Sequence, residues 1–348
     1  MKKIAFVVPS LANTGPIIVV RDLCEGLLAK GFICKVFYFD EILELEMPCS
    51  TEHVSFFSKF DFYQWDIIHS HLLRSDIWIW LRRPWFSKGE TKYITTLHNP
   101  ITYKAFRTFF NRRHSVMGSI SWTIALTRID KIVVLNSETQ QNLPWFLKRK
   151  SGVIYNGRKI IGQKKISDEK HSISIAKLRE QYRIVGSVCG MFHRKGIEQI
   201  IKTLVLLPQY GFIGVGDGPQ LEEWKELAIS LNVNDRCYWT GYTPNAIEYY
   251  SSFDVFALPS RSEGFPLALI EAAAHGLPIV LSDIPIHRSI IEENRVALFA
   301  ALDQIGNFAC TIEKAYKNKD FYGKSARQYY EKKLTVESMI ENYCKLYE

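Results

Sequence analysis

The segment from Leu258 to Asp283, LPSRSEGFPLALIEAAAHGLPIVLSD, constrains the possible folds of this chain more than any other part of the sequence. Two short runs rich in strand-forming residues, VFALPS and PIVLSD, flank the run PLALIEAAAHG, whose apolar residues recur at helical spacing. A strand, a helix and a second strand in this order are typical of a parallel sheet with crossover helices. The segment therefore predicts the α/β fold class.

Two carboxylates in this segment, Glu263 and Glu271, stand eight positions apart. If both lay on one helix, a rise of about 1.5 Å and a turn of about 100° per residue would place them roughly 12 Å apart within one quadrant. Gly264 and Phe265 would open that helix and offer backbone N–H groups to a diphosphate, and Glu271 could accept hydrogen bonds from a ribose diol. For an isolated pair, two solvated glutamates near a helix N-terminus are the alternative interpretation.

The surrounding residues favour the ligand site. The pattern PSxxEGFPLxxxEAxAxGxP resembles family 4 of the retaining, nucleotide-sugar-dependent glycosyltransferases, which are group 1 glycosyltransferases. Five further segments fall in the order of that family: IAFVVPSLANTGP, DIIHSH, TLHN, VIYNG and GVGDGP. The resemblance covers nearly the whole chain and is strongest from about residue 185 to residue 290. It implies two Rossmann-like domains that face a cleft, the glycosyltransferase B fold.

Length and composition fit two globular domains. A chain of 348 residues exceeds what one hydrophobic core usually serves, and 47% hydrophobic with 23% charged residues is ordinary for a folded enzyme. We expect an N-terminal Rossmann-like acceptor domain over residues 1–160 and a C-terminal Rossmann-like nucleotide-sugar (donor) domain over residues 175–325. The polar stretch GRKIIGQKKISDEKHS would link them. By the resemblance, a charged C-terminal helix over residues 326–348 would pack back on the N-terminal domain.

The resemblance also assigns the reacting part of the site. Lys195, in HRKG, would neutralise the diphosphate as a point charge without a metal ion. His98, in TLHN, would reach the donor sugar, and Glu263 would touch the sugar hydroxyls. Retention would follow from same-face attack, with a leaving phosphate oxygen as the base. The donor-binding residues would be Gly15, Arg194, Arg261, Gly264, Phe265, Pro266 and Glu271. No cofactor and no metal site are expected, and the two histidines of DIIHSH are interpreted as structural or cleft-lining.

Two departures from the family pattern keep other functions open. Gly190 stands where many relatives carry an arginine that grips the diphosphate, so Arg194 or Arg261 would have to replace it. The first loop, usually a pair of glycines followed by a small residue, reads Thr14, Gly15, Pro16. A catalytically weakened, glycosyltransferase-like binding or scaffold subunit is therefore the alternative to an active hexosyltransferase. A nucleotide-sugar epimerase would need an acid and base pair that the sequence does not reveal.

Charge is concentrated in the first half of the chain. Residues 1–165 contain 24 Lys plus Arg against 13 Asp plus Glu, whereas the remainder has 20 against 23. Basic and aromatic residues interleave in the segments 77–88 and 103–114, a mixture that suits an anionic membrane surface or a pyrophosphate-bearing lipid acceptor. The alternative is an amphipathic helix with its aromatic residues in the core. Nucleic acid is not an expected partner, because no reading motif accompanies the basic residues.

The sequence also favours a location. Seven cysteines are scattered without a CxxC pair, which is typical of a reducing cytoplasm. The apolar run after MKK ends at Pro9, so we interpret it as a buried strand rather than a signal peptide. No run of 18 apolar residues occurs. We therefore expect a cytoplasmic enzyme, peripheral at the inner face of the cell membrane, that transfers a hexose from a nucleotide diphosphate sugar to a lipid-linked polysaccharide or oligosaccharide. Which base, sugar and acceptor it uses is not encoded in any recognisable motif.

Overall fold

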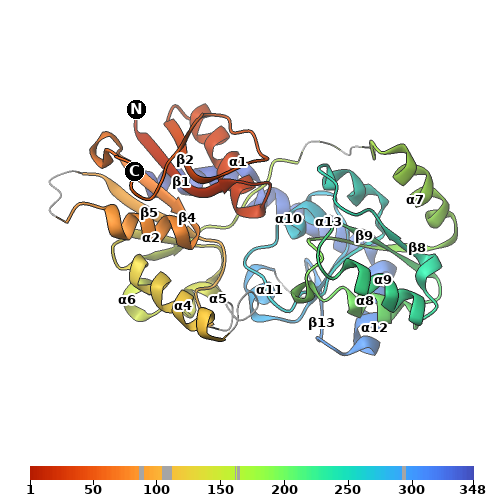
Figure 1. Cartoon of the computed structure of the whole chain (residues 1–348). Coiled ribbons are helices and arrows are strands. Elements are labelled where there is room, and N and C mark those ends of the chain that lie inside the picture. Colours follow the sequence, from red (N-terminus) through yellow and green to blue (C-terminus); the bar gives the residue numbers. More distant parts are fainter. Residues whose placement is uncertain (86–89, 104–111, 161, 163–164, 292–294) are drawn as a thin grey trace. The chain divides into compact units, whose positions relative to one another are not determined.

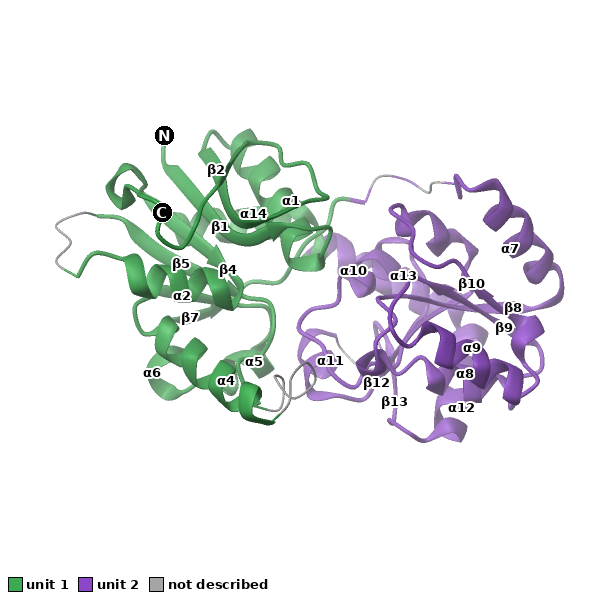
Figure 2. Ribbon diagram, in the orientation of Figure 1, with its two compact units in different colours: residues 1–159, 333–348 green, residues 160–332 purple. Residues whose placement is uncertain are grey.

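The computed structural model describes residues 1–85, 90–103, 112–160, 162, 165–291 and 295–348 (Figure 1). The chain divides into two compact units, one formed by residues 1–159 and 333–348 and the other by residues 160–332 (Figure 2). Each unit is built on a parallel sheet with helical connections, as the alternation of strands and helices in the sequence predicts. The α/β class is therefore confirmed.

The described part of the first unit contains a sheet of seven strands in the order β3-β2-β1-β4-β5-β6-β7, all paired in parallel. Six of these strands coincide with apolar runs in the sequence. The seventh, β3, has the sequence STEH and is exposed throughout, so no apolar pattern marks it. The strands are β1 (Lys3–Leu11), β2 (Ile33–Leu43), β3 (Ser50–His53), β4 (Ile67–His71), β5 (Lys92–Leu97), β6 (Lys131–Val134) and β7 (Ser151–Val153).

The helices of the first unit include the C-terminal helix α14 (Val336–Tyr347), which packs against α1 (Gly15–Ala29). Gly26 permits this close approach, because a Cβ atom there would lie 1.7 Å from Cδ1 of Ile340. The expected single helix over residues 326–348 is instead divided. α13 (Lys319–Tyr329) belongs to the second unit, a π-helical turn follows, and the Thr335 side chain caps α14. The other helices of the first unit are α2 (Leu72–Arg82), α4 (Arg112–Leu126), α5 (Ser137–Gln141), α6 (Trp145–Lys148) and the short 3₁₀ turn η1 (Phe62–Gln64).

The described second unit contains a six-stranded parallel sheet in the order β10-β9-β8-β11-β12-β13. Its strands are β8 (Arg183–Val188), β9 (Tyr210–Val215), β10 (Cys237–Trp239), β11 (Val255–Leu258), β12 (Ile279–Ser282) and β13 (Leu298–Ala300). Its helices, besides α13, are α7 (Glu169–Gln181), α8 (Glu198–Leu204), α9 (Leu221–Ser230), α10 (Leu267–Ala274), α11 (Pro285–Ile290) and α12 (Ile305–Lys317), with 3₁₀ turns η2 (His193–Lys195), η3 (Asn234–Arg236) and η4 (Ala246–Ser252). The expected linker ends earlier than predicted, since Asp168 caps α7.

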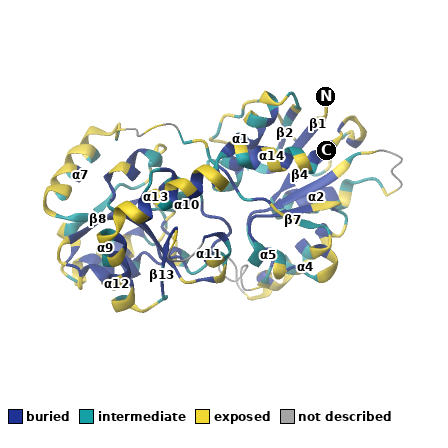
Figure 3. Ribbon diagram, turned by 180° about the vertical axis from the view of Figure 1, so that it is seen from behind, coloured by how far each residue is buried: buried dark blue, intermediate teal, exposed yellow. Residues whose placement is uncertain are grey.

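The central strands of both sheets are buried and form the centres of two separate cores (Figure 3). In each sheet the strand order changes direction beside the first strand of the unit, between β1 and β4 in one and between β8 and β11 in the other. Ligands of open α/β sheets bind outside the carboxyl ends of the strands at such switch points. The loops that follow β8 and β11, and those that follow β1, β4 and β5, are therefore the places to examine for a site.

Candidate active site

A buried ion pair joins the loops that follow β8 and β11. Nζ of Lys195 lies 2.5 Å from Oε1 of Glu263, and the two side chains are only 11% and 5% exposed. Gly196 allows the two loops to meet, because it adopts a left-handed conformation (φ 66°) and a Cβ there would lie 2.3 Å from the Pro259 carbonyl. The fold therefore brings together two site residues that are 68 positions apart in the sequence.

The surroundings of Glu263 keep its carboxylate ionised. Ser260 Oγ donates to Oε1 at 2.6 Å, whereas Nη1 of Arg194 lies 3.6 Å from Oε2, too far for a hydrogen bond. Burial alone would raise the pKa of Glu263, but the charges of Lys195 and Arg194 and the hydrogen bonds from Lys195 and Ser260 outweigh it and hold that pKa below its usual value. Oε2 thus retains capacity to accept a hydrogen bond.

The prediction that one helix carries both glutamates is wrong. α10 begins at Leu267, after Pro266 in extended conformation, so Glu263 lies in the preceding loop and only Glu271 is helical. Gly264 and Phe265 are buried and also precede the helix. The physical reason is Pro266: proline disfavours helical backbone at the residue before it.

Glu271 lies one turn into α10 and is half-buried. Its Oε2 accepts a hydrogen bond from the Tyr250 hydroxyl at 2.8 Å. Tyr250 is fully buried and stacks on His275, with ring centroids 5.1 Å apart and planes inclined by 17°. This tyrosine fixes the orientation of the Glu271 carboxylate, a role that no local pattern in the sequence indicates.

The two arginines that were expected to replace the missing diphosphate arginine differ in their partners. Arg261 is held by carboxylates on both sides, with Nη1 2.7 Å from Glu198 Oε1 and Nη2 2.8 Å from Asp303 Oδ1. Arg194 instead lies beside the buried pair, and its Nη1 donates to the Ser262 carbonyl at 3.3 Å. Between the two, Arg194 has the position that suits an anion near Lys195.

Gly190 lies where the loop after β8 is tied to the loop after β9. Met191 N donates to the Asp217 carbonyl at 2.8 Å, and Gln220 N donates to the Met191 carbonyl at 3.0 Å. A Cβ at Gly190 would lie 2.8 Å from the ring of Phe192. A side chain at position 190 would therefore require the partly exposed Phe192 ring to move.

In the first unit, His98 follows β5 and is hydrogen-bonded to a second histidine. Its Nε2 lies 2.8 Å from Nδ1 of His71, the last residue of β4. His98 keeps 6% of its surface exposed, whereas His71 is fully buried. Burial lowers the pKa of His98 to about 3, and burial, together with the charges of His69 and His98, holds the pKa of His71 well below its usual value. Both rings are therefore neutral.

A third histidine, His69, connects this pair to the C-terminal helix. Its Nδ1 lies 2.7 Å from the hydroxyl of Tyr347, and its Nε2 lies 2.8 Å from Oγ1 of Thr96. Oγ1 of Thr96 is also 2.9 Å from the hydroxyl of Tyr343. The two tyrosines of α14 therefore reach the ends of β4 and β5 from the other end of the sequence. The interpretation of His69 as structural agrees with these contacts.

Residues 168–334 match the family model described as "Glycosyl transferases group 1". Over 354 aligned residues, which cover 99% of this chain and 98% of the relative, the chain is 27% identical to the O-antigen biosynthesis glycosyltransferase WclY of Escherichia coli. Residues 168–334 are thus similar to the group 1 glycosyltransferases, and nearly the whole chain is similar to a glycosyltransferase of O-antigen biosynthesis.

Solved structures show the fold of this glycosyltransferase. Sucrose-phosphate synthase from Thermosynechococcus elongatus matches it with a TM-score of 0.82 at 20% identity, over 100% of this chain and 98% of that one. Anabaena Alr3699/HepE, solved in complex with UDP and glucose, matches with a TM-score of 0.78 at 15% identity, over 99% of both chains. The expected glycosyltransferase B fold of two Rossmann-like domains is thereby confirmed.

The remaining predicted residue, Gly15, begins α1 of the glycosyltransferase directly after the loop that follows β1. Thr14 precedes it in extended conformation and Pro16 follows in the first turn of the helix, which suits the fixed φ of proline. Gly15 is half-buried. A single glycine with an adjacent proline therefore forms this turn.

In the described part of the two basic aromatic segments, buried and exposed aromatic residues both occur, since Trp78 is fully buried and Trp85 is 75% exposed. Residues 86–89 and 104–111 lie outside the described residues. In the segment 77–88, Trp78 and Ile79 are fully buried, and Arg83 stacks 4.0 Å from the centroid of the Tyr93 ring and pairs with Asp130 at 2.8 Å. Trp78 and Ile79 therefore match the alternative of a helix with its aromatic face in the core, and contact of this segment with a membrane stays a prediction.

Two kinds of feature are absent from the described residues. No helix there is both long and apolar enough to cross a membrane. In the same part of the chain, no group of three or more His, Cys, Asp or Glu side chains is arranged to hold a metal ion.

Proposed function

We propose that this glycosyltransferase is a retaining, metal-independent hexosyltransferase that uses a nucleotide diphosphate sugar as donor. The observation that carries the proposal is the buried Lys195–Glu263 pair directly before α10, with Glu271 on that helix. In such a donor, Lys195 would contact the diphosphate, Glu263 the sugar and Glu271 the ribose. The second unit would then be the donor domain and the first unit the acceptor domain.

The contacts of the pair leave room for a ligand. An ammonium group has three N–H donors, and Glu263 occupies one of those of Lys195. The others can reach diphosphate oxygens and stabilise the negative charge that develops as the glycosidic bond breaks. Oε2 of Glu263 would accept from a sugar hydroxyl, and Arg194 would supply the second positive charge. His98 and Gly15 of the first unit would contact the donor sugar and the diphosphate, and the backbone around Gly264, Phe265 and Pro266 would line the site.

The acceptor is proposed from the relatives. WclY of Escherichia coli is named for O-antigen biosynthesis, which supports a hydroxyl of a surface polysaccharide or oligosaccharide as acceptor for this chain as well. A lipid-linked acceptor would bring the enzyme to the inner face of the cell membrane. The attacking hydroxyl would lose its proton to an oxygen of the leaving diphosphate.

Binding of nucleotides tests the proposal. The purified protein would be screened by thermal shift and calorimetry against UDP, GDP, ADP and their hexose conjugates, with and without EDTA. We expect saturable binding of nucleotides that carry one particular base, with the same affinity in the presence and absence of EDTA. Binding that EDTA abolishes would contradict metal independence, and the absence of binding to any nucleotide would favour the scaffold subunit.

We expect Glu271→Ala to weaken nucleotide binding by about 1–3 kcal/mol, because a charge-assisted contact to the ribose is lost. Tyr250→Phe should weaken binding by a smaller amount, since it removes the hydrogen bond that orients Glu271 but keeps the stacked ring. Calorimetric titration measures both. The matched control is Glu223→Ala on α9, an exposed glutamate, which should bind as the wild type does. If Glu271→Ala bound the nucleotide with unchanged affinity, the proposed contact between Glu271 and the ribose would be contradicted.

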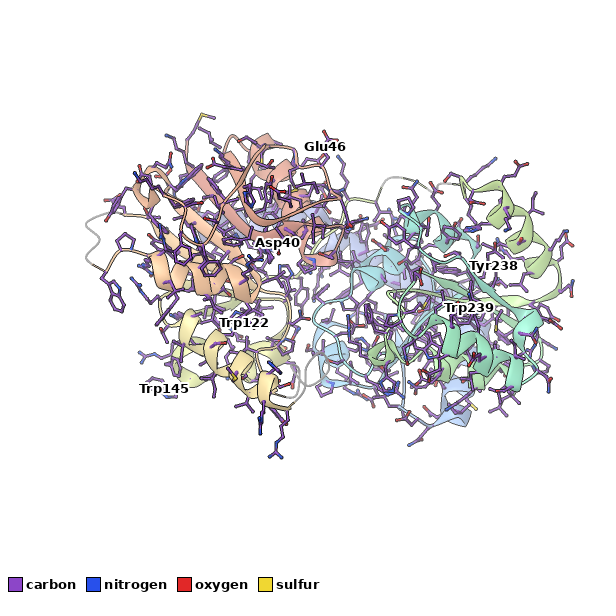
Figure 4. The ribbon with its side chains drawn as sticks, in the orientation of Figure 1. Asp40, Glu46, Trp122, Trp145, Tyr238 and Trp239 are labelled. Carbon is purple, nitrogen blue, oxygen red and sulfur yellow. The ribbon has the colours of Figure 1, made fainter. Side chains whose placement is uncertain are left out.

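An exposed apolar stripe on α4 supports a membrane-associated enzyme better than the segment 77–88 does. Val116, Met117, Ile120 and Ile124 are between 42% and 68% exposed, and spacings of three or four residues place them on one face. The opposite face carries Trp122, which is labelled in Figure 4. Its Nε1 donates to Oδ2 of Asp76 at 2.6 Å. Arginines at positions 112 and 113 begin the helix. Basic residues beside exposed apolar ones suit a bilayer with anionic lipids.

The double variant Met117→Gln/Ile120→Gln should bind anionic vesicles at least about tenfold more weakly, because it removes apolar area that would enter the lipid interface. Sedimentation with phosphatidylglycerol vesicles measures this, and binding of the wild type should fall with salt. Ile229→Gln on α9, where Ile229 is 60% exposed, is the control and should change little. Equal vesicle binding by variant and wild type would exclude the stripe as a membrane surface.

A further inference from the structure

The hydrogen bond between His71 and His98 determines what His98 can offer a ligand. Nδ1 of His71 and Nε2 of His98 are 2.8 Å apart, so one proton lies between them. The other ring nitrogen of His71, Nε2, is buried and has no hydrogen-bond partner among the described residues. We propose that His71 is a positioning residue that fixes His98 in the tautomer with its proton on Nδ1. His98 then presents an N–H donor to its ligand.

Two neutral arrangements of the pair are possible. In one, His71 Nδ1–H donates to His98 Nε2, so that the unpartnered Nε2 of His71 is a bare lone pair and His98 carries its proton on Nδ1. In the other, His98 Nε2–H donates to His71 Nδ1, and the proton of His71 must then sit on its unpartnered Nε2. Buried N–H groups without an acceptor are rarer in proteins than acceptors with unused capacity. The first arrangement is therefore favoured.

The position of His71 is itself fixed by its neighbours. The His69 ring lies with its centroid 4.4 Å from that of His71, and the Phe6 ring follows at 6.1 Å. Hydrogen bonds at both nitrogens hold the His69 ring in turn, one shared with the Thr96 hydroxyl on β5 and one with the Tyr347 hydroxyl on α14. His71 therefore cannot rotate without disturbing this packing. Its Nδ1 atom stays directed at Nε2 of His98, so the position of the proton on His71 determines the tautomer of His98.

The consequence for catalysis rests on the proposed function, in which His98 contacts the donor. An Nδ1–H group donates to an oxygen, either a sugar hydroxyl or a phosphate oxygen, and it does so as a neutral donor because both rings are buried. The bare nitrogen of the other tautomer would repel a phosphate oxygen. The orientation of the donor sugar would therefore depend on a residue that does not itself touch the sugar.

The wild-type protein gives the primary test. In ¹⁵N-histidine-labelled full-length protein, long-range ¹H–¹⁵N correlation spectra distinguish protonated from bare ring nitrogens, and the nine histidines of the chain can be assigned by single replacements. We expect His98 to show a protonated Nδ1 and a bare Nε2, and His71 to show a bare Nε2. A proton on Nε2 of His98 would overturn the proposal. This readout does not depend on glycosyl transfer, so it stands or fails separately from the proposed function.

Two variants of His71 test the effect on activity. His71→Phe keeps a ring but removes the donor, and we expect kcat/KM to fall about tenfold, with mixed tautomers of His98 in the spectrum. His71→Asn places an amide N–H near the position of Nδ1 and should restore both the tautomer and most of the activity. If His71 served only packing, His71→Phe would retain activity better than His71→Asn. That order would overturn the proposal.

Discussion

Replacement of Lys195 by methionine is expected to lower glycosyl transfer at least about a hundredfold. It is also expected to lower the free energy of unfolding of the second unit by about 3–5 kcal/mol, because the carboxylate of Glu263 would remain buried without its cation. The 2.5 Å pair is nearly closed to solvent, so little water is available to replace the ammonium group. Steady-state assays with the donor identified by the nucleotide screen measure the first effect, and urea unfolding measures the second.

A double variant separates the two roles of the pair. Lys195→Met/Glu263→Gln removes both charges together, and an apolar or neutral replacement of a whole buried ion pair is often tolerated. We therefore expect most of the lost stability to return, while activity stays low because neither charge reaches the donor. Recovery of activity in the double variant would contradict the catalytic assignment.

The control for both variants is a pair of the same chemistry on the surface. Lys225 and Glu222 of α9 lie 2.7 Å apart, with side chains 39% and 78% exposed. Exposed pairs of this kind contribute about 0–1 kcal/mol, so Lys225→Met should change neither stability nor activity appreciably. If Lys195→Met were equally mild, the phosphate contact would have to lie elsewhere, for example at Arg194.

The sequence predicts the elements of this enzyme well because each leaves a local pattern. Apolar runs of β-branched residues mark the buried strands, and the exposed edge strand STEH escapes because it buries nothing. The start of α10 was also readable, since Pro266 excludes helical backbone at Phe265 and should have placed Glu263 outside the helix. Helical spacing therefore does not extend through this proline to Glu263.

The contacts that complete the site leave no such pattern. Ser260 beside Glu263 follows a strand like many serines, and Tyr250 meets Glu271 across 21 positions of sequence. The tyrosines of α14 lie 247 and 278 positions from Thr96 and His69. Only tertiary packing brings such residues together, so a single sequence without its fold cannot indicate them.

The histidine cluster leads to the second large effect, a loss of stability of the first unit in weak acid. Histidine has an unfolded pKa of about 6.5, whereas burial lowers the folded pKa of His69 and of His98 to about 3 and that of His71 well below its usual value. The unfolded chain therefore binds up to three more protons than the folded chain. Stability from these groups is fully present above about pH 6.5 and is lost as the pH falls toward 3.

The buried carboxyl of Asp76 has the opposite effect on the pH dependence of stability. Burial raises the folded pKa of Asp76 to about 6, against the hydrogen bonds from Ser70 and Trp122 that lower it. Between about pH 4 and 6 the folded chain therefore binds one proton that the unfolded chain does not. The unfolded chain binds three protons on the histidines, and the folded chain binds one on Asp76, so the unfolded chain binds a net two more. This difference makes the free energy of unfolding fall by about 2.7 kcal/mol for each pH unit of acidification. Tyr343 and Tyr347 do not titrate in this range, because burial raises the pKa of both hydroxyls.

Hydrogen exchange of β4 and β5 between pH 4 and 7 would measure this slope for the first unit alone. His69→Gln should lower the slope by about 1.4 kcal/mol per pH unit, because one of the three protons is no longer exchanged on unfolding. The loss of its hydrogen bonds to Thr96 and Tyr347 would appear instead as a constant offset at every pH. A slope that His69→Gln does not alter would mean that His69 is charged in the folded protein, which would exclude the neutral cluster around His98.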